Sequence, residues 1–111
     1  MELTKLAQDI VYVELPPERR IRKVLGELND RVSKECDFDL IIDFSFVEVL
    51  TSVSISNLIS LQNWLKGAGH QLILCSVAVV TKCIFDVAGL DALFVLAENK
   101  DSALELLTKG K

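Results

Sequence analysis

Residues 37–66 constrain the fold of this chain more than any other stretch. Leu40, Ile41, Ile42 and Phe44 form a short apolar run that is rich in β-branched and aromatic side chains. Such a run is typical of a strand whose two faces are both covered by helices. This strand therefore favours an α/β fold with a parallel sheet, because helical crossovers are what cover both faces of such a sheet.

Hydroxyl side chains gather where the next helix is expected to begin. Thr51 and Ser52 precede a helical segment from about Val53 to Lys66. A hydroxyl at a helix start can cap free backbone N–H groups, and the helix dipole makes the same place tolerant of a phosphoryl group. The local sequence thus supports two interpretations of these hydroxyls, a structural cap and a phosphorylation switch.

The faces of this helix differ in chemistry. At 100° per residue a broad apolar stripe faces the sheet, and Ser54 falls inside it as a small packing residue. A second line of residues ends at Trp64, a residue type common at contact surfaces, so we expect this line to bind a partner. The sequence is equally compatible with a tryptophan that only flanks the core. The stripe consists of Ile55, Leu58, Ile59, Leu61 and Leu65, and the second line of Val53, Asn57, Ser60 and Trp64.

Strand and helix patterns alternate along the rest of the chain. This order predicts right-handed β-α-β units and a single α/β domain over residues 1–111, with a mixed, mostly parallel β-sheet of four to five strands and about four helices. Strands are expected at about residues 3–6, 10–15, 71–75 and 94–96. The helices are a first one near Pro17 that buries Ile21, Val24, Leu25, Leu28 and Val32, one from Ser76 that buries Val80, Cys83, Ile84 and Val87 and stops at Gly89, and a last one capped by Asp101 or Ser102.

Composition and charge argue against several classes of partner. The net charge is −4, and no basic block extends beyond the pairs at 19–20 and 22–23, so nucleic acid is not an expected partner. No segment approaches the ~18 uncharged residues that a membrane span needs. Charged Glu2, Lys5 and Asp9 stand where a signal peptide would carry its apolar core. We therefore expect a cytoplasmic protein without direct membrane insertion.

The cysteines and the histidine do not form a metal-binding pattern. Cys36, Cys75 and Cys83 include no C-x-x-C pair, and they are typical of reduced cytosolic thiols. Cys75 and Cys83 lie in apolar segments, so both are expected in the core. His70 is the single histidine and has no second ligand near it in the sequence. Neither a metal nor a cofactor is expected.

Catalytic fingerprints are not present in this sequence. It contains no G-x-S-x-G nucleophile turn, no phosphate-binding G-x-x-x-x-G-K-[ST] loop and no dinucleotide-binding G-x-G-x-x-G turn. Asp37 and Asp39 flank a strand and are expected to be solvated or capping groups rather than an acid and base pair. The protein is therefore not expected to be an enzyme.

Two segments together resemble the STAS domain family, in particular bacterial anti-sigma factor antagonists. Residues 43–55, DFSFVEVLTSVSI, are similar to the family pattern D-[LF]-S-x-[VL]-x-x-[ILM]-D-S-[ST]-G-[LIV]. Residues 69–75, GHQLILC, and 84–94, IFDVAGLDALF, are similar to its G-x-x-L-x-L and L-x-x-x-G-L-x-x-L-F patterns. The resemblance covers the chain from about Leu3 to Leu107.

The resemblance implies a partner-switching regulator. Members of this family bind a cognate serine kinase that doubles as an anti-sigma factor, which frees the sigma factor, and phosphorylation cancels that binding. The family acceptor corresponds to Ser52, with Thr51 as the second choice, and a phosphatase would be a further partner. The partner-binding residues expected here are Thr51, Ser52, Val53, Asn57, Ser60 and Trp64.

The family turn is altered around the acceptor. Thr51, Val53 and Ser54 replace the family's Asp, its second hydroxyl and its Gly, and residues 15–18 replace a loop that often helps bind the kinase. An alternative function is therefore a STAS adaptor that is not phosphorylated, or a subunit of a larger assembly such as a lipid-transport complex.

Overall fold

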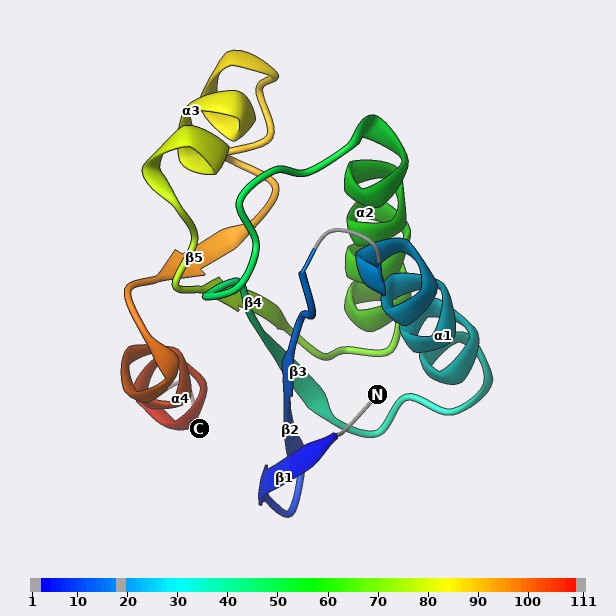
Figure 1. Ribbon diagram of the computed structural model, residues 1–111. Coiled ribbons are helices and arrows are strands. Elements are labelled where there is room, and N and C mark those ends of the chain that lie inside the picture. Colours follow the sequence, from blue (N-terminus) through cyan, green and yellow to red (C-terminus); the bar gives the residue numbers. More distant parts are fainter. Residues whose placement is uncertain (1–2, 18–19, 110–111) are drawn as a thin grey trace.

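The computed structural model describes residues 3–17 and 20–109. These residues form a mixed sheet with the spatial order β1-β2-β3-β4-β5 (Figure 1). β1 and β2 form an antiparallel hairpin, and the pairs β2–β3, β3–β4 and β4–β5 are parallel, which confirms the predicted fold class. The strands are β1 (Thr4–Ala7), β2 (Ile10–Glu14), β3 (Asp39–Asp43), β4 (Leu72–Cys75) and β5 (Val95–Ala97).

The apolar run at the centre of the sequence is the central strand of this sheet. All five residues of β3 are buried. Ile41 lies opposite Tyr12 of β2 and Ile73 of β4, and these side chains belong to the same apolar layer. The continuous apolar pattern therefore arises because both faces of β3 are covered, as the sequence predicts.

Four helices in the described part of the chain cover the sheet: α1 (Ile21–Lys34), α2 (Ser52–Gly67), α3 (Val79–Val87) and α4 (Lys100–Lys109). α1 and α2 pack side by side on one face (Figure 1). α4 packs on the opposite face, where Ala103 and Leu107 contact the layer around Ile41. α3 lies at the end of the sheet that also holds the start of α2 (Figure 1).

The first two helices bury the residues that their spacing predicts. In α1 the buried side chains are Ile21, Val24, Leu25, Leu28 and Val32. In α2 they are Ser54, Leu58, Leu61 and Leu65, while Ile55 and Ile59 pack at the margin of the same core. α2 ends before Gly69, whose φ of 79° is left-handed and suits glycine.

The predicted face of α3 is wrong. Its buried residues are Thr81 and Phe85, and the ring centroid of Phe85 lies 5.5 Å from that of Phe94. The residues expected in the core, including the thiol of Cys83, are exposed instead. Because this short helix is apolar on nearly every side, spacing alone does not define its inner face, and the aromatic side chain takes the core position. The exposed residues are Val80, Cys83, Ile84 and Val87, together with Val79.

The starts of the last two helices also differ from the prediction. Ser76 has a left-handed φ of 56° and does not begin a helix, so α3 starts three residues later at Val79. α4 starts at Lys100, and the Oδ1 atom of Asn99 accepts the backbone N–H of Ser102 at 2.8 Å. The capping side chain is therefore Asn99, because its amide oxygen reaches the free N–H group from one position before the helix.

Candidate functional site

The candidate site lies at the start of α2 and in the loop of residues 44–50 that leads to it from β3. This loop leaves the sheet at the carboxyl end of β3, the edge at which open α/β sheets commonly carry their functional groups. Phe44, Val47 and Leu50 are buried, whereas Phe46 and Val49 are 55% and 54% exposed. The loop is thus anchored by three apolar side chains and presents two others to solvent.

Thr51 is the cap of α2. Its Oγ1 atom accepts the backbone N–H of Ser54 at 3.2 Å, and its backbone is extended with φ −84° and ψ 162°. The Thr51 hydroxyl also donates to Oγ of Ser54, which is only 3% exposed, over 3.2 Å. The structure therefore gives the capping role to Thr51 and the buried packing role to Ser54.

Ser52 is the first residue of α2, and its side chain is exposed. A phosphoryl group at this position would lie next to the free N–H groups and the positive end of the helix dipole. It would add roughly −1.5 to −2 charges without breaking the cap that Thr51 provides. The geometry is compatible with a phosphoacceptor whose modification changes the binding of a partner and leaves the helix folded.

The turn before the loop is held by the carboxylate of Asp43. Its Oδ2 atom accepts the hydroxyl of Tyr12 at 2.6 Å. Its Oδ1 atom accepts the backbone N–H of Ser45 at 2.7 Å and also the Ser45 hydroxyl. Burial, followed by the hydrogen bond to Asp43, raises the pKa of Tyr12. Burial, followed by the charge of Asp43, raises the pKa of Cys75 to about 11.

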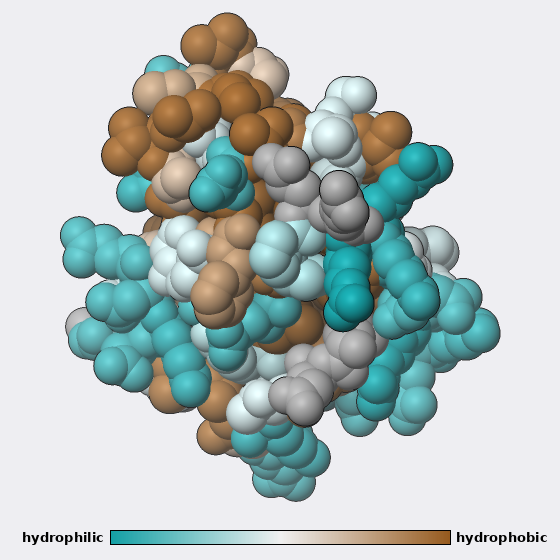
Figure 2. Space-filling model, in the orientation of Figure 1, coloured by the Kyte–Doolittle hydropathy of each residue, from teal (hydrophilic) through white to brown (hydrophobic). Residues whose placement is uncertain are grey.

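Apolar side chains surround this end of the molecule. Figure 2 shows hydrophobic residues gathered over α3 and further ones near the start of α2. Val53, one residue after Ser52, is 42% exposed. On α3, Val79 and Val87 are 73% and 89% exposed. The exposed acceptor candidate therefore lies at an end of the molecule that carries several exposed apolar side chains.

The line of residues expected to bind a partner is divided in two. Val53 lies beside Ser52. Trp64 lies twelve residues after Ser52 along α2, a separation of about 18 Å at the helical rise. Asn57, between them, is half-buried, and its carbonyl accepts Nδ2 of Asn29 on α1 at 2.9 Å. This contact with α1 interrupts the predicted surface.

The far part of that line opens onto a groove between the last turns of α1 and α2. Trp64 is 50% exposed there. The groove has a volume of about 690 Å³. It is lined by Val32, Ser33, Lys34, Cys36, Ser60, Asn63, Trp64, Gly67 and Ala68.

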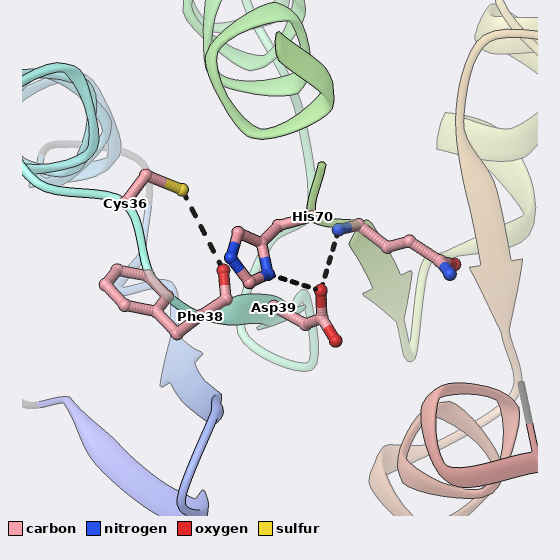
Figure 3. A network of polar contacts seen from close by, with 5 residues as sticks. Cys36, Phe38, Asp39 and His70 are labelled. Atoms are coloured by element: carbon pink, nitrogen blue, oxygen red, sulfur yellow. Dashed lines mark hydrogen bonds and ion pairs between the residues drawn. The ribbon is translucent and has the colours of Figure 1, made fainter. Parts of the chain in front are cut away.

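A polar network at the opposite edge of the sheet escaped sequence reasoning. The Nδ1 atom of His70 lies 3.1 Å from Oδ1 of Asp39, which also accepts the backbone N–H of Gln71 at 2.9 Å (Figure 3). Asp39 is 5% exposed, so of the two roles expected for it, solvated or capping, the solvated one is wrong, whereas its bond from the Gln71 N–H is of the capping kind. The nearby thiol of Cys36 donates to the carbonyl of Phe38 over 3.9 Å. This network joins the starts of β3 and β4.

Among residues 3–17 and 20–109, no group of three or more His, Cys, Asp or Glu side chains is placed to hold a metal ion. Within the same ranges no helix is long and apolar enough to cross a membrane.

Comparison with known proteins gives structural matches only. No protein-family model matches the sequence, and no curated protein matches it. An anti-sigma-factor antagonist (STAS) domain protein from Planctomyces limnophilus has a TM-score of 0.82 at 19% identity, covering 96% of this chain and 97% of that one. Phosphorylated SpoIIAA from Bacillus has a TM-score of 0.72 at 13% identity, with coverage of 96% and 97%. A chain of the stressosome has a TM-score of 0.75 at 21% identity, with coverage of 97% and 96%. This chain therefore has the fold of the STAS domains found in anti-sigma factor antagonists.

Proposed function

We propose that this protein is a STAS-type anti-sigma factor antagonist, a cytoplasmic partner-switching regulator that binds a cognate serine kinase acting as an anti-sigma factor. Phosphorylation of Ser52 abolishes this binding, and a phosphatase restores it. The observation that carries the proposal is the exposed Ser52 side chain at the first position of α2. In this proposal the protein is the substrate of the kinase and does not itself catalyse phosphoryl transfer.

Ser52 is a better acceptor than Thr51 for a structural reason. The Thr51 hydroxyl accepts the Ser54 N–H and contacts the Ser54 hydroxyl, so modification would break the cap of the helix that carries the site. Modification of Ser52 leaves this cap intact, because the Ser52 side chain is exposed to solvent. The exposed apolar side chains of Val49 and Val53, close to Ser52 in the sequence, supply contact area for the kinase, and a charge on Ser52 would oppose their burial in an interface.

We assign the other predicted contact residues to a second part of the partner surface. Ser60 and Trp64 line the groove at the far end of α2, and a half-exposed indole beside a groove is a common anchor at interfaces. Asn57 lies between the two parts, half-buried and in contact with α1. A partner that covers both parts would lie along the length of α2.

The experiment compares wild type, Ser52→Ala and Ser52→Asp in the native host. Phosphorylation sites are mapped by mass spectrometry of the purified protein, and binding to each serine kinase encoded in that genome is measured by calorimetry. We expect phosphate on Ser52, wild-type affinity for one kinase in the Ala variant, and at least tenfold weaker binding of that kinase by the Asp variant. Ser56→Ala, an exposed hydroxyl one turn further along α2, is the matched control.

Other outcomes decide between the two functions. If Ser52 carries no phosphate and all variants bind the same partner equally, the switch is refuted and the adaptor function takes its place. Phosphate on Thr51 alone would refute the choice of acceptor. Folding of each variant is checked by thermal unfolding, because an unfolded Asp variant would mimic a loss of binding.

A further inference from the structure

A carboxylate is buried at the point where β3 ends and the loop of residues 44–50 begins. Asp43 is 6% exposed, and a buried carboxylate is costly unless hydrogen bonds replace its lost hydration. Three donors provide this replacement, namely the Tyr12 hydroxyl and the backbone N–H and hydroxyl of Ser45. Each donor is a neutral group, and each belongs either to the neighbouring strand β2 or to the loop itself.

The three bonds fix the first turn of the loop. Both bonds from Ser45 go to Oδ1 of Asp43, an arrangement in which an aspartate side chain closes a turn over the next two residues. Tyr12 holds the other oxygen, so the carboxylate cannot rotate away from Ser45 without losing the phenol. The hydrogen bond from Tyr12 of β2 to Asp43 therefore fixes the direction in which the chain leaves β3.

Tyr12 is itself held in place. Its ring is buried in the layer between the sheet and α4, at 7% exposure. The ammonium group of Lys100 at the start of α4 lies 4.8 Å from the ring centroid, a distance suited to a cation–π contact. The phenol is thus presented to Asp43 by a rigid ring and not by a mobile side chain.

The direction of the first turn determines where Ser52 lies. The backbone N–H of Phe44 donates to the carbonyl of Cys75 at 2.9 Å, and that of Val47 to the carbonyl of Phe44 at 3.0 Å. Leu50, buried against the same core, is the last residue before Thr51 and Ser52. A change at Asp43 would therefore pass to the start of α2 along a short segment that is anchored by Phe44, Val47 and Leu50.

We infer that Asp43, held by the Tyr12 phenol, is a positioning residue that fixes the loop presenting Ser52 to its partner. This inference rests on the proposed function for its biological meaning. Its structural content does not depend on phosphorylation, because it concerns the order of residues 44–52 in the protein alone. Asp43 and Tyr12 touch neither a substrate nor a partner in this role.

The test removes single atoms from the network and reads local opening by amide hydrogen exchange. In Tyr12→Phe the ring and its packing remain, but Oδ2 of Asp43 loses its donor. We expect the loop amides, including those of Ser45 and Val47, to exchange about tenfold faster. The buried Asp43 oxygen that has lost its donor destabilises the closed loop relative to its locally open form. Amides of α1 should keep their wild-type rates.

Two further variants and a control complete the design. Asp43→Asn keeps an oxygen acceptor and should retain most of the loop's protection from hydrogen exchange, whereas Asp43→Ala should lose this protection. Leu28→Ala, a cavity variant in the middle of α1, lowers global stability without touching the network. The inference is overturned if Tyr12→Phe speeds exchange uniformly over the chain, as the Leu28→Ala control does, or leaves loop exchange unchanged.

A second readout separates this inference from the proposed function. In the native host, phosphate occupancy of Ser52 should fall severalfold in Tyr12→Phe relative to Leu28→Ala. If Ser52 is never phosphorylated, the proposed function fails while the hydrogen-exchange result still decides the positioning role. If Ser52 is phosphorylated at equal levels in both variants, positioning of the acceptor is refuted and the proposed function stands.

Discussion

Three hydroxyl residues at the start of α2 have three different roles because their environments differ. Thr51 caps the helix, Ser54 is buried against the core, and Ser52 is exposed. The Thr51 cap is a bond to a residue three positions away, and the burial of Ser54 follows from its place in the helical stripe, so both roles lie within reach of local sequence reasoning. Ser52 is exposed because, at 100° per residue, it falls on the side of α2 opposite the stripe that contains Ser54, Leu58 and Leu61.

Removing the cap should cost a measurable amount of stability. We expect Thr51→Ala to lower the free energy of unfolding by about 1 kcal/mol, because the N–H of Ser54 then loses its acceptor. Chemical denaturation measures the change. Ser56→Ala should be neutral within about 0.5 kcal/mol, since that exposed hydroxyl lies inside the helix, where alanine is the better helix former. Equal losses in both variants would contradict the capping role.

Residue pairs that are distant in the sequence could not be predicted. The bonds between Tyr12 and Asp43 and between His70 and Asp39 each join residues 31 positions apart. Each pair is brought together only when neighbouring parallel strands are in register. A single sequence gives the residue types but not this register, so the buried network that holds the loop became visible only in the structure.

At the scale of elements, α1 and α3 show when periodicity is informative. α1 has charged residues opposite its apolar stripe, so only one face could be buried, and the predicted face is correct. α3 has apolar side chains on both faces, so the pattern allows either. The aromatic ring of Phe85 decides the outcome, because it fills a large core volume beside Phe94.

Substitutions on the two faces of α3 should therefore have very different costs. We expect Phe85→Ala to lower the free energy of unfolding by about 3–5 kcal/mol, as for a fully buried aromatic side chain. Val87→Lys, at a residue that is 89% exposed, should change it by less than about 0.5 kcal/mol. Urea unfolding followed by circular dichroism gives both values. A large loss of unfolding free energy in Val87→Lys would contradict the exposed position of Val87 and support the buried stripe predicted from the sequence.

At the scale of the whole molecule, two apolar layers meet at the central strands. The layer toward α1 and α2 is the larger, and the layer toward α4 contains Tyr12, Ile41 and Cys75. The ionisable groups of the second layer, Tyr12 and Cys75, lie near the buried carboxylate of Asp43. Ionisation of either group would place a second negative charge beside Asp43, so the folded state keeps both protonated.

This arrangement predicts a loss of stability at high pH. The ordinary pKa of a thiol, near 9, is raised to about 11 for Cys75 by burial and then by the charge of Asp43. Above pH 9 the unfolded chain releases this proton while the folded protein retains it, so the stabilising contribution is complete below pH 9 and falls as the pH rises towards 11. The raised pKa of Tyr12 acts in the same direction.

The measurement is the free energy of unfolding between pH 8 and 11 for wild type and Cys75→Ala, with reducing agent present. We expect the wild type to lose stability more steeply over this interval, because the variant has no buried thiol to deprotonate. A Cys83→Ala protein is the matched control, since that thiol is exposed and its removal should leave the slope unchanged. Parallel curves for wild type and Cys75→Ala would show that the central thiol is not linked to folding, and the loss at high pH would then have to come from Tyr12 or other groups.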